Sequence, residues 1–262
     1  MKTIKSIITA IALTAITLSL SAQEYKHPVK QAKKIHIKGV LGKIDVEGYN
    51  GDELIIRGNK LEKKPERARG LKPVYKSGIQ DNTDIGLNVS EAGNMIVITG
   101  ASKQSEDGEY LFRVPRDLAI AINYQSPFAN DDISLSNIRG EVEMKTMNGD
   151  VYMEKITGPA VIHTMNGNIE ATFTTVNQEN PISITSMNGH LDITLPADTP
   201  ADVKMSSMNG QVYTNFDMDF EKEKEDLKYV GGGRDVPGKI NGGGVRIHLK
   251  SMNDNIYLRK NK

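Results

Sequence analysis

The sequence TMNGDV at residues 146–151 returns with small changes as TMNGNI at 164–169, SMNGHL at 186–191 and SMNGQV at 207–212. A further copy, SMNDNI at 251–256, has Asp254 in place of the glycine. The spacings between the asparagines are 18, 22, 21 and 44 residues, so the last is about two periods. A repeat of about 20 residues built around one turn is typical of a stacked solenoid.

Apolar and polar residues alternate on both sides of every turn, which is the signature of β-strands. Four residues before each asparagine stand Met144, Ile162, Ile184, Met205 and Leu249. Because such columns match between copies, we predict an all-β fold: a single-stranded parallel β-helix (a β-solenoid) with coils of about 20 residues. The alternative is an antiparallel β-meander or sandwich, since Asn-Gly is also a strong hairpin signal.

The Asn-Gly pairs are expected to form the corners, because both residue types tolerate positive φ. Stacked asparagine amides would bond from coil to coil, and the preceding Thr or Ser hydroxyl would satisfy backbone groups of the turn. Asp254 is what we expect of a terminal coil. The predicted structural turn residues are Asn148, Gly149, Asn166, Gly167, Asn188, Gly189, Asn209, Gly210 and Asn253.

The remaining sequence is organised around this repeat. Residues 1–22 have the basic start, apolar stretch and small residues of a signal peptide, with cleavage expected after Ala22. We predict one β-helix domain over 23–262, with less regular N-terminal strands at 23–135 and regular coils at 136–262. Residues 217–241 are expected to form a long exposed loop that explains the doubled spacing before Asn253, and 61–84 a second such loop.

Composition excludes several classes of function. The 33 basic and 33 acidic side chains balance, which gives no electrostatic case for nucleic acid. There is no cysteine, so disulfides, thiol catalysis and a lipid-modified cysteine are excluded. No second apolar stretch of spanning length follows the signal, so we expect an exported protein without a transmembrane segment once the signal is removed: periplasmic, associated with the outer membrane, or extracellular.

Motifs for chemistry are missing from the sequence. It contains no G-x-S-x-G, and the scattered His27, His36, His163, His190 and His248 lack H-x-x-x-H spacing. The glycine triplets at 231–233 and 242–244 are not followed by the Lys-Ser/Thr of a phosphate loop. We therefore expect no catalytic residues, no metal and no cofactor.

Strand alternation instead predicts a surface. If the third and fifth residues after each asparagine point inward, the second (+2) and fourth (+4) point outward. Tyrosine has a flat apolar body and a polar tip, which suits glycan or protein binding. The opposite strands carry a more basic outer face that includes Lys145, Lys204 and His248. The candidate ligand-binding residues of the +2 and +4 columns are Asp150, Tyr152, Asn168, Glu170, His190, Asp192, Gln211, Tyr213, Asn255 and Tyr257.

These features together resemble a known family. Strands separated by G-x-I/V, the VP at 114–115, the repeated T/S-x-N-G-x-I/V and the stretch INGGGVRIHLKSMNDNIYL at 240–258 resemble the bacterial putative-adhesin family. The resemblance covers most of 33–259 and implies a β-helix at the envelope or surface, with no catalytic residues to carry over. It implies a non-enzymatic adhesin or binding scaffold. The alternatives are a periplasmic polymer-binding or sensing module, or a glycan-processing β-helix enzyme.

Overall fold

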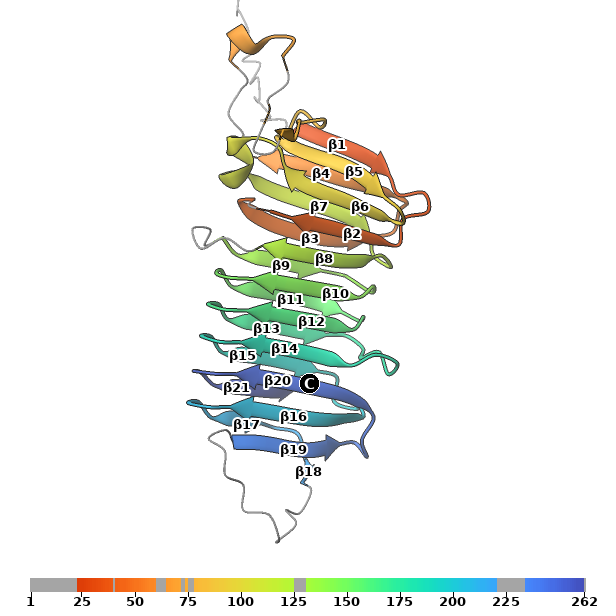
Figure 1. The fold of residues 1–262 in the computed structure, drawn as a ribbon. Coiled ribbons are helices and arrows are strands. Elements are labelled where there is room, and N and C mark those ends of the chain that lie inside the picture. The colour runs from red at the N-terminus through yellow and green to blue at the C-terminus, as the bar shows by residue number, and fades with distance from the viewer. Residues whose placement is uncertain are drawn as a thin grey trace, which may run out of the picture.

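The computed structural model describes residues 23–39, 41–59, 65–71, 74, 78–124, 131–220 and 234–261. The expected signal peptide at 1–22 lies outside the described residues. The described strands form two sheets that enclose one elongated hydrophobic core (Figure 1). The described residues also include the short 3-10 helices η1 (Glu66–Ala68) and η3 (Lys103–Glu106).

The strands of the two sheets, sheet A and sheet B, lie in a spatial order that differs from chain order. Across sheet A the order is β1 (Gln23–Pro28), β4 (Glu53–Asn59), β7 (Glu109–Pro115), β3 (Lys43–Tyr49), β9 (Ile133–Ser136), β11 (Val151–Ile156), β13 (Ile169–Phe173), β15 (Leu191–Leu195), β21 (Ile256–Lys260) and β17 (Val212–Thr214). Across sheet B it is β18 (Asp219–Phe220), β19 (Arg234–Ile240), β16 (Ala201–Ser207), β20 (Val245–Ser251), β14 (Ile182–Ser186), β12 (Ala160–Thr164), β10 (Val142–Thr146), β8 (Ala119–Tyr124), β2 (Lys34–Lys38), β6 (Met95–Gly100) and β5 (Leu87–Ala92).

Each coil of the repeat is a strand of sheet B, the Met-Asn turn and a strand of sheet A. Strands of successive coils pair in parallel and in register, so that Met144 faces Ile162 and Ile162 faces Ile184. These side chains are buried, as the alternation requires. The parallel pairing confirms the predicted β-solenoid, and the antiparallel strand pairs of the described residues lie towards the two ends of the stack.

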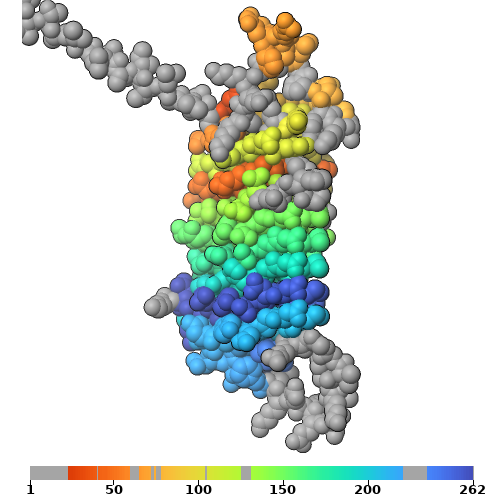
Figure 2. Space-filling view, turned by 90° about the vertical axis from the view of Figure 1, so that its left-hand side faces the viewer, coloured from red at the N-terminus to blue at the C-terminus, as the bar shows by residue number. Residues whose placement is uncertain are grey.

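The coils do not stack in chain order. Strands β20 and β21 lie between the coil of β14 and β15 and the coil of β16 and β17. Figure 1 shows this inserted pair in dark blue, and the space-filling view shows the same dark band between two lighter ones (Figure 2). The prediction that the copy with Asp254 is a terminal coil is therefore wrong. Met205 pairs with Leu249, which in turn pairs with Ile184.

In the N-terminal part, too, one coil lies out of chain order. Strands β2 and β3 lie between the coil of β6 and β7 and the coil of β8 and β9. The region 23–135, predicted to be less regular, contains three parallel coils of the same kind. The first coil and the last coil in the sequence are both interior in the stack.

Antiparallel strands cover the two ends. At the N-terminal end β4 and β1 extend sheet A, and β5 extends sheet B. At the other end β19 pairs with β16 over seven residue pairs, from Ala201↔Ile240 to Ser207↔Arg234, and β18 follows it. The predicted loop at 217–241 is therefore partly strand, because its second half satisfies the free edge of β16; residues 221–233 lie outside the described residues. The described parts of 61–84 contain no strand.

Side chains in the turns form hydrogen bonds between neighbouring coils. The asparagine amides form a ladder in stack order: Asn166 Nδ2 donates to Asn148 Oδ1 (2.9 Å) and Asn188 Nδ2 to Asn166 Oδ1 (2.8 Å). Asn253 then donates to Asn188, and Asn209 to Asn253. The preceding hydroxyls are buried, and Ser186, Ser251 and Ser207 each donate to a backbone carbonyl of the neighbouring coil.

The turn glycines are needed for a different reason from the one expected. Among the predicted turn residues only Gly149 has positive φ, at +84°. A Cβ at Gly167 would lie 2.1 Å from the carbonyl oxygen of Gly149, and one at Gly189 would lie 2.1 Å from that of Gly167. At Gly210 the same contact, to Asp254, would be 2.2 Å. The positive-φ prediction is wrong at these three glycines, where the close approach of neighbouring coils excludes a side chain.

Candidate binding face

The +2 residues form a second ladder beside the asparagines. The backbone N–H of Asn168 donates to Asp150 Oδ1 (2.7 Å), and that of His190 donates to Asn168 Oδ1 (3.1 Å). At the end of the stack, the N–H of Gln211 donates to Asn255 Oδ1 (2.8 Å). A side-chain oxygen at +2 therefore satisfies the turn of the next coil, so these groups are partly used within the molecule.

His190 interrupts this ladder. Its imidazole does not accept the N–H of Asn255 in the next coil of the stack. That N–H instead donates to Asp254 Oδ1 at 2.7 Å. Asp254 stands where the other copies have glycine, and its carboxylate accepts the N–H that the +2 side chain of the preceding coil accepts elsewhere in the stack. His190 and Asp254 are therefore two linked departures from the regular repeat at this part of the face.

The +4 residues lie in one row across sheet A, in the order Tyr152, Glu170, Asp192, Tyr257 and Tyr213. The inserted last coil makes Tyr257 and Tyr213 neighbours, and their rings stack at 5.3 Å between centroids with 10° between planes. Their hydroxyls are held as well: Asn255 Nδ2 donates to that of Tyr257 (3.2 Å), and that of Tyr213 donates to Gln211 Oε1 (2.9 Å).

Charged and polar groups surround this ring pair. Arg259 binds Asp192 through two hydrogen bonds, Nε to Oδ1 at 2.6 Å and Nη2 to Oδ2 at 2.7 Å. The guanidinium also lies 5.4 Å from the centre of the Tyr257 ring, and His190 meets that ring edge-on at 6.2 Å. We call Tyr213, Tyr257, His190, Asp192 and Arg259 the tyrosine platform.

Tyr152 lies apart from the platform, separated from it by the coils that carry Glu170 and Asp192. Its hydroxyl donates to Asp150 Oδ2 at 3.3 Å. Partial burial, together with the negative charge of Asp150, raises the pKa of Tyr152. Glu170 lies between the two groups, with its Oε1 at 3.7 Å from His190 Nε2. The ten candidate residues therefore share one face, but only part of them converge.

Arg259 is the platform residue that the sequence prediction missed. It stands six residues after Asn253, on the same side of strand β21 as Tyr257. Extending the outward alternation by one more step, from +4 to +6, would have placed it on this face. Its contact with Asp192 depends on coil order, which the alternation does not reveal.

The arrangement brings polar, charged and aromatic side chains together on one face. Among the described residues, no three His, Asp or Glu side chains gather in a way that could hold a metal ion. Within the same part of the chain, none of the helices has the length and apolar content that a membrane span requires. What the face offers is a flat, partly apolar surface with hydrogen-bonding groups at its margin, which is suited to contact with a ligand.

Fold and face together define the class of protein: a two-sheeted parallel β-solenoid with a patterned outer face. The chain belongs to the Toastrack DUF4097 family, whose model matches residues 120–259, and this confirms the resemblance seen in the sequence. A comparison with curated proteins gives no match.

Two solved structures are similar to this chain. A putative cell adhesion protein from Clostridium sporogenes is 12% identical, with a TM-score of 0.44, over 92% of this chain and 100% of that chain. A putative adhesin from Bacteroides fragilis is 15% identical, with a TM-score of 0.39, over 93% of this chain and 98% of that chain.

Proposed function

We propose that this protein is an exported, non-enzymatic binding scaffold of the cell surface or envelope, and that the tyrosine platform on sheet A binds a glycan. In this proposal, residues 1–22 are removed and 23–262 act as one domain. The observation that carries it is the exchange at His190. In the regular repeat the +2 side chain accepts the backbone N–H of the +2 residue in the next coil. At this coil the +2 residue is instead His190, which lies against the stacked tyrosine pair, and Asp254 accepts the N–H of Asn255.

The geometry of the ring pair favours a sugar over other ligands. Strand β17 is the edge of sheet A, so no further strand of the described sheet covers the second face of the Tyr213 ring. That side chain is 47% exposed. An open aromatic face packs against the C–H face of a sugar ring, and neighbouring carboxylate and guanidinium groups hydrogen-bond its hydroxyls. Asp192 and Arg259 already hold each other in place for this role.

The substitution His190→Asn separates binding from folding. An asparagine at +2 restores the acceptor seen in Asn168 and Asn255, so we expect the free energy of unfolding to stay the same or to rise. Binding to an array of neutral and amino-sugar oligosaccharides, followed by calorimetry on the best hit, is expected to weaken about tenfold or more, which is about 1.4 kcal/mol. The double variant Tyr213→Ala/Tyr257→Ala should lose binding altogether.

Tyr152→Ala is the matched control, since it removes a tyrosine of the same row outside the platform. It should leave affinity unchanged. The proposal is wrong if the wild-type protein binds none of the oligosaccharides, or if His190→Asn and the double tyrosine variant both bind as well as the wild type. Fractionation with protease shaving of intact cells tests the location: a protein cleaved on intact cells acts at the surface, whereas one confined to the periplasm is a polymer-binding module there.

A further inference from the structure

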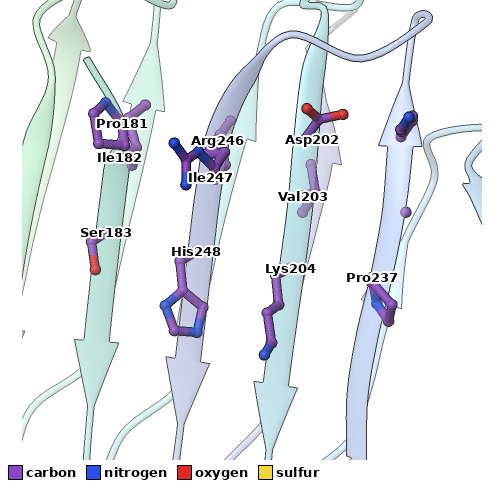
Figure 3. A pocket seen from close by; sticks show the side chains of 12 residues that line it. Pro181, Ile182, Ser183, Asp202, Val203, Lys204, Pro237, Arg246, Ile247 and His248 are labelled. Atoms are coloured by element: carbon purple, nitrogen blue, oxygen red, sulfur yellow. The ribbon is translucent and has the colours of Figure 1, made fainter. Parts of the chain in front are cut away.

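The opposite face of the molecule, the outer side of sheet B, has a shallow groove of about 670 Å³ across strands β14, β20, β16 and β19 (Figure 3). It lies over the inserted last coil and its neighbours. Its lining residues are Pro181, Ile182, Ser183, Asp202, Val203, Lys204, Pro237, Gly238, Lys239, Arg246, Ile247 and His248.

The groove has an excess of positive charge. Three cationic side chains, Lys204, Lys239 and Arg246, line it together with a single carboxylate, that of Asp202. Lys204 pairs with Asp235 at 2.8 Å. Arg246 and Lys239 are exposed, and among the described residues neither has an ion-pair partner. Their charges are therefore available to an anion from solvent.

The cations are ordered by the sheet. In-register pairing places His248 between Ser183 and Lys204 in one row across the strands, as Figure 3 shows. Arg246 lies two residues before His248 on β20 and is paired with Asp202 on β16. Asp202 is paired on its other side with Lys239 on β19. Neighbouring strands are about 4.8 Å apart. An extended polymer that runs along the solenoid axis thus meets a new polar or charged side chain at each strand.

The lining distinguishes between anionic polymers. Single-stranded nucleic acids are held by successive aromatic side chains that stack on bases. None of the described residues that line the groove is Phe, Tyr or Trp, and Phe220 pairs with Gly238 at one edge of it. Of its apolar lining residues, Pro181 and Pro237 are exposed and lie at the two outer strands of the groove (Figure 3), whereas Ile182, Val203 and Ile247 are buried. Proline rings and aliphatic stems suit the C–H faces of sugars, and a guanidinium binds a carboxylate with two parallel hydrogen bonds.

We propose that the groove is a second binding site, for an acidic polysaccharide. Arg246 and Lys239 contact the carboxylates of the polysaccharide, and His248 and Ser183 contact its hydroxyls. This site is independent of the tyrosine platform, which lies on the other sheet. The protein then has two faces of different chemistry, one for a glycan on sheet A and one for a polyanionic glycan on sheet B, and can connect the two.

The test uses polygalacturonate oligosaccharides as the acidic probe and the same oligosaccharides with fully methyl-esterified carboxyls as the neutral one. The full chain should bind the acidic probe, less tightly as salt is added, and bind the esterified probe at least about tenfold more weakly. The variant Arg246→Gln/Lys239→Gln should lose at least about tenfold in affinity for the acidic probe. Inorganic polyphosphate serves as a competitor of different anionic chemistry.

The matched control is Lys38→Gln/Lys145→Gln, which removes the same charge from exposed positions of sheet B outside the groove. It should bind as the wild type does. Equal binding of both probes overturns the proposal, as does an equal loss in the control variant or unchanged affinity in the groove variant. If polyphosphate binds through the same two residues while the uronate does not, the assignment to a carboxylate polysaccharide is wrong.

Discussion

Replacing Gly167 by alanine tests why the repeat needs its glycines. The added Cβ would lie 2.1 Å from the carbonyl oxygen of Gly149, whereas an ordinary contact begins at 3.4 Å. The two coils must therefore separate locally by about 1.3 Å, the difference between these distances. Gly167 does not have positive φ, so a change in backbone strain does not contribute.

The cost follows from the hydrogen bonds that cross this turn. The N–H of Asn166 donates to the carbonyl of Met147 (2.8 Å), the N–H of Asn168 to Asp150 Oδ1 (2.7 Å), and the Asn166 amide to Asn148 (2.9 Å). Lengthening each by the required amount takes it beyond hydrogen-bond range. At about 0.5–1.5 kcal/mol for each of the three bonds, we expect a loss of about 1.5–4.5 kcal/mol in the free energy of unfolding, and more for Gly167→Val.

Denaturant unfolding measures this loss, and Gly93 provides the contrast. Gly93 has φ of +62°, and a Cβ added there would meet nothing within 4 Å, so only backbone conformation acts at this position. Gly93→Ala should cost about 1–2 kcal/mol and Gly93→Asn much less, because asparagine tolerates this conformation. At Gly167, asparagine should be as costly as alanine. A Gly167→Ala protein within about 0.5 kcal/mol of wild type, or a rescue by asparagine, would refute the steric explanation.

Two further predictions concern pH and coil order. Burial first, and nearby lysines second, lower the pKa of His36 and of His248 below 6.5, so unfolding takes up protons and stability should fall as pH drops through about 6.5. Replacing both histidines with glutamine should flatten that part of a stability–pH curve; an unchanged slope would contradict the burial argument. Because the chain has no cysteine, engineered pairs report neighbours directly: Thr185→Cys/Lys250→Cys lie on adjacent strands and should form a disulfide under mild oxidation. Thr185→Cys/Ser206→Cys, two strands or about 9.6 Å apart, should stay reduced, and the reverse result would reject the inserted coil.

Local structure could be predicted from the sequence because it depends on short-range pattern. The alternation around Asn166 and Asn188 is sufficient to predict strands, parallel register and the amide ladder. The reason why the turns need glycine could not be predicted. Glycine is favoured both where φ is positive and where the backbone of a neighbouring coil approaches closely, and the two cases differ only in φ and in the position of the neighbouring carbonyl. At Gly149 both apply; at Gly167 only the second does.

The order of the coils in the stack could not be predicted, because all copies of the repeat have the same alternation of apolar and polar residues. Ser207 and Ser251 begin turns with the same apolar columns, so either coil fits against β14. Specific contacts, such as the bidentate pair of Arg259 with Asp192, exist only in the observed order. The tyrosine platform depends on that order as well. Its two rings come from turns 44 residues apart in the sequence, and the platform was therefore only partly visible as a column of outward residues.

The inserted last coil has a consequence for how the chain is made. During synthesis from the N-terminus, β16 and β17 are complete before their permanent neighbours β20 and β21 exist. A product that stops before β20 either keeps β14 and β16 as unpaired edges, open to proteases and to aggregation, or pairs them with each other and excludes the observed coil order. Strands β20 and β21 therefore complete the stack, because the observed coil order exists only in a polypeptide that contains them.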